Sequence, residues 1–333
     1  MTDRLFDWED IDKDAEDNTS FNGSPSGSDP DMSVDLGRIK LANPIITCSG
    51  TFSHGEEHQP FYDISILGAV TTKSYSLKSR KGNPPPRVCE TPAGLLNSIG
   101  LQNEGIDAFI GSHLRQMNEA GAKIILSIFG RDAEEFKKVA LKVLDVKSEI
   151  LAVELNLSCP NIERGGISFC AIPEEVEKVV DGVVSMLDVP VIAKLSPNHD
   201  NIIQSAIMAR KAGAEALSVV NTIVGMAVDI ETARPLLGNI TGGLSGPAIK
   251  PVALVKVYEL AEEDILPIIG MGGIFDYRDV LEFMIVGASA ISLGTVNLVD
   301  YDAGKKILAD LKNYLAKKKI ESIKSIIGRL EGT

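Results

Sequence analysis

The sequence predicts an α/β protein, and three observations favour a closed barrel of parallel strands. Short apolar runs alternate along the chain with segments of helical periodicity, as in successive βα units. Eight such runs occur between residues 44 and 293, the number that closes a (β/α)8 barrel. Each run ends in a glycine or a small polar residue, so every strand end looks functional. The alternative, a doubly wound sheet, would place its site at a single switch point.

The predicted barrel strands are rich in Ile, Val and Ala and comprise residues 44–47, 68–72, 123–128, 150–156, 189–194, 216–220, 267–269 and 288–293. Helical periodicity is clearest at residues 133–146, 173–186 and 277–286. Residues 34–41, around Gly37, predict a short hairpin before the first barrel strand. Residues 305–319 and 321–330 predict two lysine-rich terminal helices.

Two segments, 77–106 and 223–249, are too long for plain loops and are rich in Gly and Pro. We expect them to form lobes over the C-terminal mouth of the barrel. Together with the barrel they make one catalytic domain, residues 33–333. Residues 1–32 form an acidic tail whose composition predicts disorder, although the apolar stretch 5–8 could dock on a partner or on the barrel.

The formal net charge of the 333 residues is −13, and the first 32 residues supply −8 of it, with ten acidic against two basic side chains. The remainder is only mildly acidic, which argues against a general nucleic-acid-binding protein. No run of 18 apolar residues occurs, so we expect no membrane span. The acidic N-terminus is typical of neither a signal nor a transit peptide.

Four cysteines, at positions 48, 89, 159 and 170, lack the CxxC spacing of a metal site. They predict reduced thiols in a cytoplasmic protein, without disulfides and without a metal. The segment His54–Gly–Glu–Glu–His58 matches the H-x-x-E-H pattern of some zinc proteases. Because it contains a glycine and runs into Pro60, we expect a solvated loop there rather than a helical zinc site.

The stretch after residues 150–153 concentrates the most reactive side chains, because the apolar run ends in Asn156, Ser158, Cys159, Pro160 and Asn161. Gly165–Gly166 then suits a loop that closes over a substrate. A plain structural interpretation, with Cys159 as a small buried apolar side chain, is the alternative. Lys73 and Lys194 also follow strands, where a lysine is costly unless it meets an anion. Asn97 and Asn221 add amides that suit a polar heterocycle.

Three glycine-rich stretches, residues 241–246, 270–273 and 294–295, come late in the chain. The last two follow the seventh and eighth predicted strands, the usual phosphate site of a barrel. The spacing is not the dinucleotide fingerprint G-x-G-x-x-G. A flavin mononucleotide (FMN) therefore fits better than a nicotinamide dinucleotide.

Four segments carry a family resemblance: Asn–Leu–Ser–Cys–Pro–Asn at 156–161, the stretches 97–103 and 269–273, and Ile–Thr–Gly–Gly–Leu–Ser–Gly–Pro–Ala–Ile–Lys–Pro at 240–251. They resemble class 1 dihydroorotate dehydrogenases, and the last resembles the class 1B catalytic subunit. The resemblance runs from about residue 33 to 330. It implies a TIM barrel with FMN that oxidises dihydroorotate to orotate in pyrimidine biosynthesis. It also implies a homodimer that pairs with an iron–sulfur subunit, carrying FAD and 2Fe-2S, to form a heterotetramer that reduces NAD+.

The resemblance assigns a role to individual residues. Cys159 is the expected general base, taking a proton from C5 of the substrate while a hydride leaves C6 for the flavin. Expected substrate contacts are Lys73, Asn97, Ile99, Gly100, Leu101, Asn156, Asn161, Asn221 and Thr222. Expected FMN contacts are Ser49, Gly50, Lys73, Ser74, Ser127, Asn156, Lys194, Val220, Gly246, Gly272, Gly273, Gly294 and Thr295. Ser127 stands where the subclass usually has Asn, and the acidic tail has no counterpart in the family pattern.

Other functions stay open at this point. One is a different FMN-barrel pyrimidine oxidoreductase, like dihydropyrimidine dehydrogenase, acting on dihydrouracil or on a reduced base in RNA. Another is class 1A-like use of fumarate as the acceptor. A third is a barrel that binds a ligand without turnover. The pairing of Lys73 with Asn97 favours a carboxylate-bearing substrate, and the acidic charge balance argues against RNA.

Overall fold

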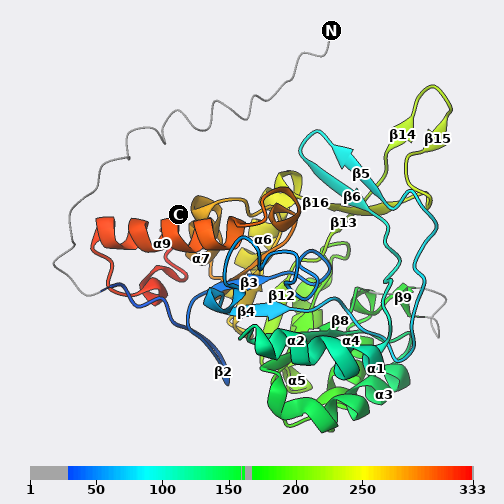
Figure 1. Ribbon diagram of the computed structural model, residues 1–333, viewed down its shortest axis with the longest axis horizontal. Helices are drawn as coiled ribbons and strands as arrows, with labels where there is room; N and C mark the ends of the chain where they lie inside the picture. The colour runs from blue at the N-terminus through cyan, green and yellow to red at the C-terminus, as the bar shows by residue number, and fades with distance from the viewer. Residues whose placement is uncertain (1–28, 159, 162–166, 332–333) are drawn as a thin grey trace.

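The structure is a computed structural model, and it describes residues 29–158, 160–161 and 167–331. Eight parallel strands close into a barrel and follow one another in chain order (Figure 1). They are β3 (Ile45–Thr47), β4 (Ala69–Thr71), β7 (Ile124–Ile128), β8 (Ala152–Asn156), β11 (Val191–Lys194), β12 (Ala216–Val219), β17 (Ile268–Gly270) and β18 (Ala290–Leu293). Every residue of these strands is buried, as expected of a sheet covered by helices. The predicted (β/α)8 barrel is confirmed.

The surrounding helices use the apolar faces that the sequence indicated. In α3 (Ala133–Val143), the residues Phe136, Val139, Ala140 and Val143 are buried at helical spacing. Asp132 caps this helix by accepting from the Glu135 N–H at 2.7 Å. The other α-helices are α1 (Ile106–Ala108), α2 (Leu114–Glu119), α4 (Pro173–Val184), α5 (Ile202–Lys211), α6 (Lys250–Glu262), α7 (Tyr277–Ile285), α8 (Val296–Val299) and α9 (Ala303–Lys318). A π-helical turn, Phe109–His113, joins α1 to α2.

The predicted N-terminal hairpin is present as β1 (Val34–Leu36) and β2 (Ile39–Leu41), which pair in antiparallel fashion. Gly37 at its turn has φ +65°, a conformation that glycine adopts without strain. The Arg38 guanidinium contacts Glu215 at 2.6 Å, directly before β12 begins. The hairpin therefore lies at the N-terminal end of the barrel, opposite the strand ends that carry the candidate site.

The prediction of a second terminal helix at residues 321–330 is wrong. Only the 3-10 turn Ile323–Ile326 forms there, and Gly328 follows it with φ +68°. The backbone is used for a tertiary contact instead, because the Ile323 N–H donates to the Asp31 carbonyl at 2.9 Å. Burial of Ile323 and Ile326 fixes the segment against the core.

That contact also shifts the expected tail boundary. Asp31 pairs with Ser322 as an isolated β-bridge, and the Asp31 N–H donates to the Glu321 carbonyl at 2.8 Å. Met32 is 5% exposed. These two residues, assigned above to the tail, therefore belong to the folded domain. The disorder expected of residues 1–28 stays a prediction, because they lie outside the described residues.

The two long insertions meet in one sheet over the barrel mouth. The first supplies β5 (Val88–Thr91) and β6 (Gly94–Asn97), and the second supplies β13 (Ile223–Gly225) and β16 (Gly242–Ser245). The sheet order β13-β16-β6-β5 joins the insertions through the β16–β6 pair. A further hairpin, β14 (Val228–Asp229) with β15 (Arg234–Pro235), extends beyond this sheet in Figure 1. A short ladder joins β9 (Pro160–Asn161) to β10 (Ile167–Ser168).

Among the described residues, no helix combines the length and the apolar character needed to cross a membrane.

Candidate active site

A pocket of about 820 Å³ opens at the C-terminal ends of the barrel strands, under the sheet formed by the insertions. Most of the expected site residues line it. They are Ser49, Gly50, Lys73, Ser74, Asn97, Ile99, Gly100, Leu101, Asn156, Lys194, Val220, Asn221, Thr222, Gly246, Gly272, Gly273, Gly294 and Thr295. Cys159 and the expected hinge Gly165–Gly166 lie outside the described residues, and Asn161 is described only through the backbone pairing of β9.

The glycine-rich stretches meet at one side of this pocket. Gly246 and Gly273 have φ +92° and +77°, and a Cβ added to Gly273 would lie 2.8 Å from the Gly246 carbonyl oxygen. The Thr295 hydroxyl donates to Ser245 Oγ at 2.8 Å, which ties the end of β18 to the same place. The resulting hollow is lined by backbone, follows β17 and β18, and lies close to the start of α6. Such a surface fits a phosphate group.

Amides and hydroxyls that also line the pocket form a chain of hydrogen bonds. Asn156, at the end of β8, donates from Nδ2 to Ser74 Oγ at 3.3 Å. Asn221, after β12, donates from Nδ2 to Asn156 Oδ1 at 3.4 Å, and its own Oδ1 accepts from the Thr222 N–H at 2.8 Å. Asn97, on β6, donates to the Gly243 carbonyl at 3.2 Å. These amides are held by neighbours, so their remaining donors and acceptors have fixed directions.

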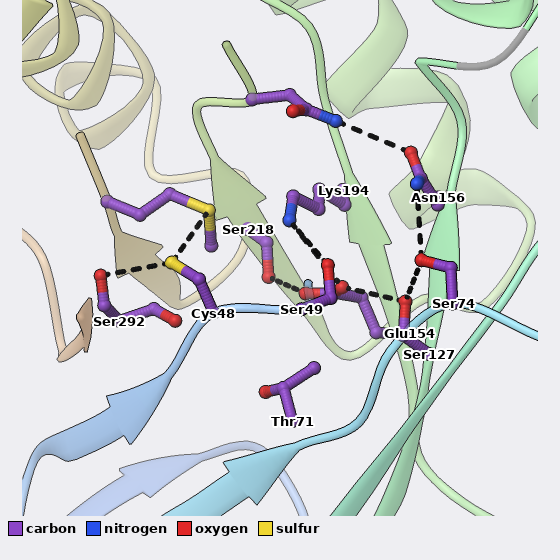
Figure 2. Close-up of polar contacts among 12 residues, drawn as sticks. Cys48, Ser49, Thr71, Ser74, Ser127, Glu154, Asn156, Lys194, Ser218 and Ser292 are labelled. Atoms are coloured by element: carbon purple, nitrogen blue, oxygen red, sulfur yellow. Dashed lines mark hydrogen bonds and ion pairs between the residues drawn. The ribbon is translucent and has the colours of Figure 1, made fainter. Parts of the chain in front are cut away.

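Two lysines at strand ends bring positive charge to the pocket wall, where Arg80 also lies. Lys194 is buried and donates to Ser49 Oγ at 3.0 Å, as Figure 2 shows. Lys73 is half-buried, and no group among the described residues pairs with its ammonium. Burial lowers the pKa of Lys73, and the nearby positive charge of Arg87 lowers it further. An unpaired, partly desolvated cation at a pocket wall indicates an anionic ligand.

The loop Ile99–Leu101 approaches the pocket from the first insertion. Leu101 has φ +58°, the left-handed region that leucine rarely adopts. Gly100 has φ +72°, and a Cβ there would come within 2.5 Å of the Asn83 backbone nitrogen. Backbone strain of this kind persists only where the surroundings impose it, and it is concentrated at functional sites.

Ser127 lies beneath the pocket rather than on its wall. It is completely buried, and its hydroxyl is shared between Ser74 Oγ, 2.8 Å away, and Glu154 Oε1, 3.1 Å away. Its expected contact with a cofactor is therefore not supported by its placement. Ser127 instead supports Ser74, which does line the pocket.

Several pocket residues were not anticipated. They include Arg80, Asn83 and Asn198, which line the pocket. Ser158, which the sequence did single out, also lines the pocket, and its buried hydroxyl has no partner among the described residues. The most informative residue to which the sequence assigned no role is Glu154, which is 3% exposed inside the barrel. A charged residue within the apolar run of a buried strand was the signal that could have singled it out.

The solvated loop expected at residues 54–58 is correct only in part, because the segment forms a turn-rich loop with Glu56 and Glu57 exposed but with both histidines buried. His54 and His58 are both buried, because His54 Nε2 contacts the Tyr75 hydroxyl at 2.5 Å and His58 Nδ1 contacts the Tyr301 carbonyl at 2.9 Å. His54 also stacks on His113, with ring centroids 4.0 Å apart and planes 8° apart. The side chains of His54, Glu56 and His113 offer possible ligand atoms within 4.8 Å of one another. Nearly parallel stacked rings cannot direct two lone pairs at one ion unless a ring turns.

Comparisons with known proteins agree over most of the chain. The sequence model of the family described as "Dihydroorotate dehydrogenase" matches residues 32–315. A relative from Citrifermentans bemidjiense, named "Dihydroorotate dehydrogenase B (NAD(+)), catalytic subunit", is 47% identical over 302 residues, which are 91% of this chain and 99% of the relative. Relatives of the same name from Geotalea daltonii and Caldicellulosiruptor saccharolyticus are 47% and 46% identical, over 91% and 90% of this chain and 99% of each relative.

The barrel, the pocket at its C-terminal mouth and the extent of these matches lead to one conclusion: the chain belongs to the dihydroorotate dehydrogenase family.

Proposed function

We propose that this chain oxidises dihydroorotate to orotate with bound FMN, in the biosynthesis of pyrimidines. The observation that carries the proposal is the composition of one pocket. It combines the cation of Lys73, which has no ion-pair partner among the described residues, the fixed amides of Asn97, Asn156 and Asn221, and a glycine-lined hollow. A ring with alternating N–H and C=O groups and one carboxylate needs amides and a cation of this kind.

Membership of the family implies a flavin cofactor, and the residues present fit FMN. The hollow at Gly246, Gly273 and Thr295 is lined by backbone, leaves no space for side chains, and suits a phosphate. Lys194 is buried and also lines the pocket, so its ammonium would be available to the flavin ring. A single phosphate site without the dinucleotide fingerprint favours FMN over FAD.

Each residue of the site then has a proposed role in the reaction. FMN held by the glycine-lined hollow and Lys194 would supply the acceptor for the hydride of the substrate. Cys159 is the proposed general base, since a thiol with an ordinary pKa of about 8.5 is partly ionised near neutral pH. Lys73 and Asn97 hold the carboxylate, and Asn156, Asn161, Asn221 and Thr222 orient the ring. Closure of the loop around Cys159 over the substrate, which would exclude water, stays a prediction, because Cys159 and residues 162–166 lie outside the described residues.

The proposed electron acceptor is NAD+, reached through a partner subunit that carries FAD and an iron–sulfur cluster. The names of the relatives support this step, since they specify NAD+ and a catalytic subunit. We also propose a homodimeric core in the cytoplasm. The hairpin of β14 and β15 and the residues just before it carry exposed apolar side chains, including Met226, Val228 and Ile230. Such an assembly could cover this surface.

Flavin analysis and anaerobic titration test the proposal. We expect released FMN at about one per chain and bleaching of the flavin by dihydroorotate, but not by dihydrouracil. The reduced chain alone should be reoxidised slowly by NAD+ and readily by artificial acceptors, whereas rapid reoxidation by fumarate would favour class 1A-like chemistry. A colourless, folded protein, or one that releases FAD, would contradict the cofactor assignment.

A further inference from the structure

The barrel interior holds a carboxylate that no role assigned above explains. The Glu154 side chain is 4% exposed, on β8. Its Oε1 accepts from Ser127 Oγ of β7 at 3.1 Å, and its Oε2 accepts from Ser218 Oγ of β12 at 2.9 Å. Only β11 separates β12 from β8, so the carboxylate links strands that are not direct neighbours on one side of the barrel interior (Figure 2).

Burying a carboxylate costs several kcal/mol unless hydrogen bonds and an opposite charge compensate for the lost water. The two serines and Lys194 supply both. Lys194 Nζ lies 3.8 Å from Glu154 Oε1, beyond direct hydrogen-bond distance, and donates to Ser49 Oγ at 3.0 Å instead. The ammonium is thus balanced by the carboxylate yet held toward the pocket.

The negative charge also fixes the direction of a chain of hydrogen bonds. A carboxylate can only accept, so the single proton of the Ser127 hydroxyl points to Glu154. In the 2.8 Å contact between Ser74 and Ser127, Ser74 must therefore be the donor. Ser74 Oγ then accepts from Asn156 Nδ2, which leaves Asn156 Oδ1 to accept from Asn221. The orientation of both pocket amides follows from one buried charge.

We propose that Glu154 is a positioning residue that balances Lys194 beneath the flavin site and sets the orientation of the Asn156 and Asn221 amides. The proposal rests on the proposed flavin site. It has two consequences. The carboxylate disfavours added negative charge on a nearby flavin, so it lowers the reduction potential of the bound cofactor. It also presents a fixed pattern of donors and acceptors to the substrate ring.

Glu154→Gln tests both consequences, because it removes the charge and keeps the shape. The introduced amide can donate to Ser127, so the Ser127 hydroxyl is free to donate to Ser74. The Asn156 side-chain amide can then flip, which exchanges its oxygen and nitrogen. We expect the affinity for reduced relative to oxidised FMN to rise at least tenfold, a shift of about 30 mV in the two-electron potential. Orotate affinity should fall about three- to tenfold, the usual effect of one misdirected hydrogen bond.

Two further variants separate positioning from plain structural support. Glu154→Asp keeps the charge, so the potential should stay near that of the wild type. Glu215→Gln makes the same charge change at the opposite end of the barrel, where Glu215 pairs with Arg38, and should leave potential and orotate affinity unchanged. A purely structural role for Glu154 predicts lower stability and weaker FMN binding in Glu154→Gln without a change in potential.

If Glu154→Gln alone fails to fold, the double variant Glu154→Gln/Lys194→Met becomes the test. Removing both members of a buried charge pair is far less damaging than removing one. The proposal requires the double variant to recover urea stability, and equal instability of the two variants would overturn it. An unchanged potential in folded, FMN-loaded Glu154→Gln would overturn it as well. Failure of the wild type to bind FMN would instead count against the proposed function.

Discussion

Gly246 and Gly273 approach so closely that a Cβ on Gly273 would lie 2.8 Å from the carbonyl oxygen of Gly246. They come from different glycine-rich stretches, one after β16 and one after β17. Their contact forms the hollow to which we assign the FMN phosphate. The close approach, rather than the glycine content, is what makes these positions intolerant of a side chain.

Gly273→Ala should therefore weaken FMN binding. The added methyl group would clash with the Gly246 carbonyl, and the alanine would have to adopt φ +77°. Because such strain costs ~1–3 kcal/mol, the affinity of the apoprotein for FMN should fall about tenfold or more. Fluorescence titration of the apoprotein with FMN measures this. Gly328→Ala is the matched control, because Gly328 also has a positive φ but has nothing within 4 Å of an added Cβ. Equal FMN affinity in the two variants would contradict the phosphate assignment.

Lys73→Gln should weaken orotate binding about 10- to 100-fold, because a charge-assisted hydrogen bond contributes ~1.5–3 kcal/mol. Orotate titration followed through the flavin spectrum gives the value, with the exposed Lys78→Gln as the control. Burial lowers the pKa of Lys73 from 10.5, so in the wild type orotate affinity should begin to fall with rising pH before that value. Orotate affinity in Lys73→Gln should lack that decline, and retention of the decline would assign it to another group.

His54 should make the fold less stable in mild acid. Burial, and then the charges of His113 and Lys73, lower its pKa from 6.5 to about 4, so the unfolded chain takes up a proton that the folded chain does not. Stability is therefore full above about pH 6.5 and declines toward pH 4. Urea unfolding at several pH values should show a shallower decline for His54→Gln. Tyr75→Phe is the control, because it removes the hydrogen bond to His54 but keeps the titrating ring, so its stability should still decline in acid. If the stability of His54→Gln declined as steeply as that of the wild type, His54 would be excluded as the source.

Truncation should distinguish the acidic tail from the domain. Deleting residues 1–28 should leave FMN content and urea stability unchanged, because the composition of this segment predicts no packed core. Deleting residues 1–32 should lower stability, since it removes the Asp31 pairing with Ser322 and the buried Met32. A loss of stability or flavin in the shorter deletion would show that the stretch Leu5–Trp8 docks on the domain.

Local pattern was sufficient to predict the barrel. Its strands are continuous apolar runs because both faces are buried, and each run ends at a glycine or a small polar residue that can face a ligand. Most expected site residues accordingly line one pocket. Residues 321–330 show the limit of the same method, because helical periodicity there was overridden by the contact of Ile323 with Asp31.

Features that depend on distant segments were not predictable. The pairing of β16 with β6 joins residues about 150 positions apart, and no local signal specifies it. The burial of His54 depends on Tyr75, and the burial of Glu154 depends on serines from two other strands. A charge inside an apolar strand indicates that such partners exist without saying where they are.

The central claim is that the chain oxidises dihydroorotate with Cys159 as the base, and anaerobic stopped-flow reduction of the bound flavin tests it most directly. Dihydroorotate should reduce the wild-type flavin at a rate that rises with pH through one ionisation. In Cys159→Ala the reduction rate should fall about 10²- to 10⁴-fold, while FMN and orotate still bind. Cys89→Ala, which alters a half-buried cysteine on β5, should reduce at the wild-type rate. A near-normal rate in Cys159→Ala would contradict the proposed mechanism.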